Sequence, residues 1–92
     1  MTEGEKYFKQ QHDKFLWLRS QSIWNGEQIK ECFTKDEVVC HEMLNQELFY
    51  LWQERTVKMA LIYIREVYPD TKEGDLWRVR EEYSDMVSAI YG

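Results

Sequence analysis

The 92-residue sequence has few of the residues that break or cross-link a chain: one proline, four isolated glycines and two cysteines. So few breakers favour long helices, and isolated glycines exclude a glycine-rich phosphate-binding loop. Two cysteines, Cys32 and Cys40, do not make a disulfide framework. The first residues also lack the basic start and apolar stretch of a signal peptide. We therefore expect a cytoplasmic protein with reduced thiols.

Long apolar runs and an excess of positive charge are also missing. The longest apolar runs, 48–52 and 59–64, are far shorter than the roughly 20 residues of a membrane span. The chain has 12 Lys and Arg against 17 Asp and Glu, which gives a net charge of −5. A general nucleic-acid binder needs a basic surface instead. We predict one domain over residues 1–92 that binds neither a membrane nor nucleic acid directly.

Aromatic residues are abundant, at 15% of the chain with four Trp, six Tyr and four Phe. They supply core area to a short chain, but they are also enriched at interfaces. The four tryptophans lie on or near apolar stripes but away from their centres. Because Trp is rarely buried completely and is frequent in interaction hot spots, we predict that one or two of them contact a partner protein. The candidates are Trp17, Trp24, Trp52 and Trp77.

The apolar spacing is helical almost everywhere, and no segment alternates as a strand would, so the predicted fold class is all-α. A first helix is expected from Glu3 to about Ser20. It contains a polar stretch in which His12 is expected to be exposed. Asn25 and Gly26, which tolerate positive φ, are expected to end it. A short helix over 27–33 should follow.

The best-marked helix start is at Thr34, where Thr34 and Glu37 have the spacing of a capping box. The helical pattern then continues to Tyr68, before Pro69. A continuous helix over 35–68 would be about 50 Å long. It must therefore either bend near 53–56 or project and pair with a second chain. We expect a small helical bundle with this long central helix, and a homodimer that covers it.

The last helix has one clear amphipathic stripe, and Asp75 or Asp70 is its expected N-cap. The stripe contains Leu76, Val79, Tyr83, Met86, Val87 and Ile90.

Sites for metal binding or catalysis are poorly supported by the sequence. Cys32, Glu37, Cys40 and His41 contain a helical Glu–His spacing, but they match no short zinc motif. Buried structural cysteines are the favoured interpretation. No motif marks an activated nucleophile. We predict no metal, no cofactor and no enzymatic activity.

One short segment nevertheless resembles an enzyme family. Residues 80–87, with Glu82 and Asp85 spaced to hold magnesium on one helical face, resemble the second acidic motif of the MazG-like nucleotide pyrophosphohydrolases, which are small all-α enzymes. The resemblance implies magnesium ligands at Glu82 and Asp85. The family also has an earlier Glu-x-x-Glu motif on a facing helix, which this sequence lacks.

The main functional prediction is a non-enzymatic protein–protein interaction module: a small acidic adaptor, inhibitor or assembly factor. The magnesium-dependent nucleotide hydrolase is one alternative. A second is an acidic mimic of DNA that occupies a DNA-binding protein, because the negative charge arises entirely after residue 33. Arg78 and Arg80 interrupt that acidic surface.

Overall fold

The computed structural model describes residues 2–21, 25–44 and 53–91, which form helices and no strands. The helices are α1 (Glu3–Arg19), α2 (Gly26–Cys32), α3 (Lys35–Met43), α5 (Glu54–Val67) and α6 (Glu73–Tyr91). The all-α prediction is confirmed for these ranges. None of these helices combines the length and the apolar character needed to cross a membrane.

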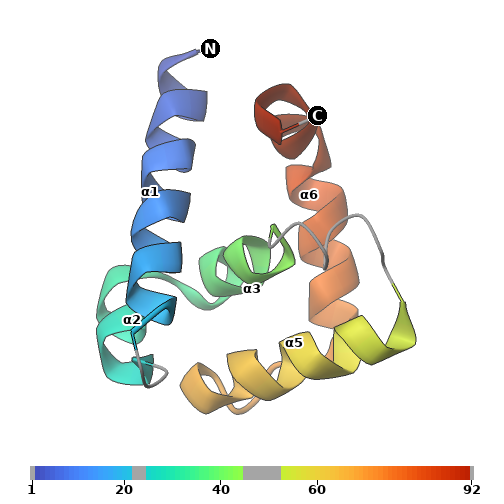
Figure 1. Cartoon of the computed structure of the whole chain (residues 1–92). Helices are drawn as coiled ribbons and strands as arrows, with labels where there is room; N and C mark the ends of the chain where they lie inside the picture. The colour runs from blue at the N-terminus through green and yellow to red at the C-terminus, as the bar shows by residue number, and fades with distance from the viewer. Residues whose placement is uncertain (1, 22–24, 45–52, 92) are drawn as a thin grey trace.

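The helices are arranged around α3 (Figure 1). α1 and α6 lie on either side of α3, and α5 runs across one end of the molecule. The two chain termini lie at the opposite end. The radius of gyration is 12.5 Å and the extents are 33 × 27 × 20 Å, so the helices pack as a compact body.

The helix α3 is the centre of the core. Its residues from Val38 to Leu44 are all buried, so neighbours cover it on every side. The predicted capping box starts it: the Thr34 hydroxyl accepts from the Glu37 N–H at 3.3 Å, and the Glu37 carboxylate accepts from the Thr34 N–H at 3.0 Å. Both of these bonds satisfy N–H groups that a helix start leaves unpaired.

The prediction of one helix over 35–68 was wrong. α3 ends at Met43, with Leu44 as its C-cap, and α5 begins at Glu54 after an extended Gln53 (φ −109°, ψ 153°). The alternative, a bend near 53–56, coincides with the extended Gln53 before α5, but it does not account for the end of α3 at Met43. A straight helix of about 50 Å would also exceed the longest extent of the molecule, 33 Å. The argument for a dimer that rested on helix length therefore fails.

Two expected helix ends also differ. α1 ends at Arg19, and Asn25 has a negative φ of −86°, so a positive-φ stop at Asn25 does not end it. In α6, Asp75 lies in the first turn rather than at the N-cap. Its carboxylate accepts from the Lys72 N–H at 3.0 Å, which is the role of the acidic residue in a capping box.

Candidate functional site

Several large apolar side chains remain exposed although the core is well filled. They come from α1, α5 and α6, and their exposed fractions range from 36% to 64%. They are Tyr7, Leu16, Trp17, Met59, Ile62, Tyr63 and Trp77. Single exposed apolar residues are ordinary, so the informative feature is where they share a face.

Two of the four tryptophan candidates lie in the described part of the chain. Trp17 is 64% exposed on α1, and Trp77 is 40% exposed on α6. With 3.6 residues per turn, Trp17 points away from the buried Phe15 and His12, among the exposed polar Gln10, Asp13 and Lys14. Trp24 and Trp52 lie outside the described residues.

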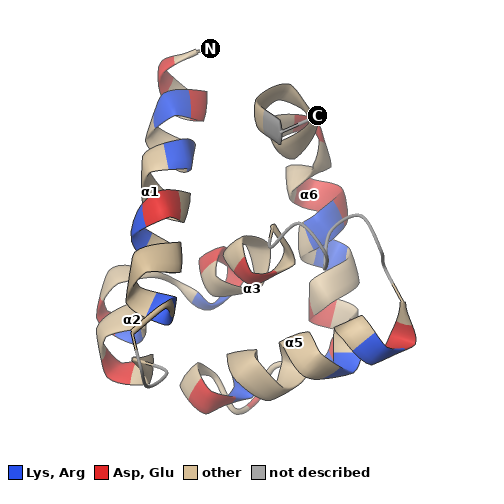
Figure 2. Cartoon of the chain, viewed as in Figure 1, with Lys and Arg blue, Asp and Glu red and all other residues tan. Residues whose placement is uncertain are grey.

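The exposed apolar residues of α5 share one face of the helix. Val57, Ala60, Leu61, Ile64 and Val67 face the core. Met59, Ile62 and Tyr63 lie on the other side, at the three- and four-residue spacings that place side chains together. Figure 2 shows an uncharged middle stretch of α5 between charged ends. The predicted contact residues, all tryptophans, did not include this side of α5.

A cation–π contact joins this side of α5 to the end of α1. The Arg19 guanidinium lies over the Tyr63 ring, 4.5 Å from its centroid. Leu16 lies one turn before Arg19, so its 37% exposed side chain borders the same junction. Cation–π contacts at partly exposed sites contribute about 0.5–1 kcal/mol.

The same arginine approaches a buried carboxylate. Arg19 Nε lies 2.8 Å from Glu42 Oε2, and the Glu42 side chain is fully buried. The two groups are placed to form a close ion pair when Glu42 is ionised. Glu42 Oε1 has no hydrogen-bond donor within the described residues. Burial raises the pKa of Glu42 to about 7, although Arg19 acts in the opposite direction.

The prediction that His12 is exposed was wrong. His12 is only 4% exposed, and its Nδ1 lies 3.0 Å from Nδ1 of the buried His41. When both rings are neutral, one donates through its Nδ1–H and the other accepts at Nδ1, so the accepting ring carries its own proton on Nε2. Burial lowers the pKa of His12, and it lowers the pKa of His41 to about 3, with a further contribution from His12.

Aromatic rings pack against His41. Phe8 and Phe15 stack on it, and Phe33 contacts it edge-on. Burial among these apolar rings explains why His41 favours the neutral state. The polar residues around His12 in the sequence gave no signal for its burial, because its partner is 29 positions away.

The expectation that the cysteines are buried is confirmed for Cys40 and wrong for Cys32. Cys32 is exposed and Cys40 is buried. Burial raises the pKa of Cys40 to about 12, so its thiol is not activated. Across the described ranges, no group of three or more His, Cys, Asp or Glu side chains is placed to hold a metal ion.

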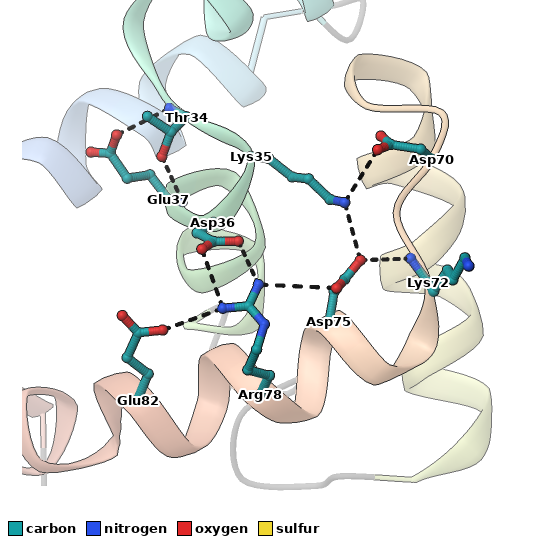
Figure 3. A network of polar contacts seen from close by, with 9 residues as sticks. All are labelled: Thr34, Lys35, Asp36, Glu37, Asp70, Lys72, Asp75, Arg78 and Glu82. Atoms are coloured by element: carbon teal, nitrogen blue, oxygen red, sulfur yellow. Dashed lines mark hydrogen bonds and ion pairs between the residues drawn. The ribbon is translucent and has the colours of Figure 1, made fainter.

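Two acidic residues of α6, Asp75 and Glu82, lie in a network of ion pairs between α3 and α6 (Figure 3). The Arg78 guanidinium donates to both carboxylate oxygens of Asp36, at 2.7 and 3.2 Å, and to Glu82 at 3.4 Å. Lys35 pairs with Asp75 at 3.2 Å and with Asp70 at 3.4 Å. The hydrogen bond from the Lys72 N–H is the main reason that the pKa of Asp75 is lowered. The Arg78 guanidinium therefore lies beside Glu82, one of the two carboxylates that the resemblance implies as magnesium ligands.

Comparison of the chain with protein-family models, with curated protein sequences and with solved structures gave no significant match.

Proposed function

We propose that this protein is a non-enzymatic protein–protein interaction module. The observation that carries the proposal is the row of exposed apolar residues on the outer side of α5. The core uses the opposite side of this helix, so folding of the chain does not require Met59 or Ile62 to be apolar. Apolar contacts of this kind supply the centre of protein interfaces, where charged residues are depleted.

The charge pattern also favours binding over catalysis. The magnesium ligands implied by the resemblance include Glu82, which is paired with Arg78. The acidic surface expected of a DNA mimic is likewise interrupted, because Arg78 and Lys35 form ion pairs with Asp36, Asp75 and Asp70. A cytoplasmic location, where reduced thiols suit an exposed Cys32, belongs to the same proposal.

The test is affinity capture with the tagged chain from its native host, read by mass spectrometry. We expect a specific protein to be captured by the wild type and lost with Ile62→Glu. Glu73→Arg, an exposed change in the first turn of α6, is the matched control because it alters charge away from α5. Capture that is equal for wild type and Ile62→Glu would contradict the proposed surface.

Trp17 is the second candidate contact, and it can be tested in the same assay. Trp17→Ala should weaken capture by about tenfold or more if this ring is a hot spot. It should leave the melting temperature nearly unchanged, because Trp17 is 64% exposed. Trp77→Ala provides the comparison on α6. Unchanged capture with both variants would exclude these two tryptophans from the contact.

A further inference from the structure

We propose that the outer face of α5 binds a second copy of this chain across a two-fold axis. The face, called the α5 outer face below, consists of Lys58, Met59, Ile62 and Glu66. All four side chains are exposed. This inference rests on the proposed function, because it names the occupant of the same face.

The order of charges on the face selects an antiparallel arrangement. Lys58, Ile62 and Glu66 are four residues apart, so they form one ridge along the helix. With Ile62 on the two-fold axis of an antiparallel pair, Lys58 of each copy lies opposite Glu66 of the other. A parallel pair would instead place Lys58 against Lys58.

The apolar residues lie at the centre of this arrangement. Ile62 is 63% exposed and would meet its own copy at the axis, with Met59 beside it. The charged ends then surround an apolar centre, as in typical interfaces. Surface ion pairs add little affinity, but like charges in the wrong arrangement are unfavourable, so the charges fix the orientation.

The length of α5 limits the affinity expected for the dimer. Its 14 residues span about 21 Å. Contact between two such helices buries less than the roughly 1,200 Å² of a standard interface. The association should therefore be weak and reversible, and it must be measured over a concentration series.

Charge exchange tests the inference by sedimentation velocity with purified full-length chains. Lys58→Glu alone sets two carboxylates against each other at both ends of the interface, and Glu66→Lys alone does the same with two ammonium groups. Each single variant should raise the dissociation constant by about tenfold or more. An equimolar mixture of the two variants should restore association, because every contact then joins opposite charges. The double variant Lys58→Glu/Glu66→Lys should also dimerise.

The mixture provides the control for folding, since two misfolded chains would not recover specific association. Lys58 also pairs with Glu54 at 2.9 Å within α5, so circular dichroism of each variant checks the helix. A wild type that stays monomeric across the series, or single variants that dimerise normally, would overturn the inference. If the wild type is monomeric while Ile62→Glu still loses a captured protein, self-association is wrong and the proposed function stands.

Discussion

The buried pair of His12 and His41 makes the stability of this protein depend on pH in a defined direction. Both pKa values are lowered in the folded state from the ordinary 6.5, so protonation favours unfolding. The contribution of the two neutral histidines to stability is complete above pH 6.5, and it is lost as the pH falls from there towards about 3. The unfolding free energy should fall by up to about 1.4 kcal/mol per pH unit for each histidine.

The variant His12→Phe/His41→Phe tests this effect. Removing both rings together leaves neither nitrogen buried without its partner. Urea unfolding between pH 5 and 7 should show that the double variant lacks the loss of stability below pH 6.5. If wild type and double variant have parallel pH profiles, the pair is not neutral in the folded state.

The titration of Glu42 changes the unfolding free energy with pH in the opposite direction. Its pKa is raised from 4.5 to about 7 in the folded state, so the folded protein holds a proton that the unfolded chain has released. This contribution is complete below pH 4.5 and is lost as the pH rises through about 7. Glu42→Gln, which cannot titrate, should remove that loss. Its stability should therefore increase relative to wild type between pH 5 and 8.

Glu66→Gln is the matched control for this prediction, because Glu66 is exposed on α5. It should leave the pH profile of unfolding unchanged under dilute, monomeric conditions. A constant difference between Glu42→Gln and wild type from pH 5 to 8 would show that Glu42 is ionised throughout.

Individual helices were predicted best where the signal is local. The spacing of Thr34 and Glu37 located the start of α3, because a capping box involves only four consecutive residues. The pattern after it gave no sign of the end of α3 at Met43, because the apolar spacing continues in register past that point. The burial of His12 depends on a partner 29 positions away, and helical periodicity contains no information about such distant contacts.

The capping box of α3 should contribute measurably to stability. Thr34→Ala removes the acceptor for the Glu37 N–H and should cost about 1 kcal/mol of unfolding free energy. Thr2→Ala is the matched control, because Thr2 and Glu5 form the same capping box at the exposed start of α1. The first turn of α1 is mostly exposed and can open locally, so this loss should be smaller. Equal losses would show that α3 gains nothing from its central position.

At the scale of the whole molecule, the enclosure of α3 predicts cooperative unfolding. Every residue from Val38 to Leu44 is buried, and α1, α2, α5 and α6 all contribute to the surrounding packing or connect to it. Opening α3 alone would expose His41 and Glu42 together with their apolar neighbours. The amides of α3 should therefore exchange with solvent only through global unfolding.

Ile64→Ala tests this coupling from a different helix. Ile64 is fully buried on α5, and its truncation should cost about 2–5 kcal/mol of unfolding free energy. Native-state hydrogen exchange should show the same decrease for the amides of α3, although the substitution lies on another element. Amides in the first turn of α1 exchange through local fraying and should change little. If α3 kept its protection while global stability fell, α3 and α5 would belong to separate cooperative units, and the core described above would not unfold as one.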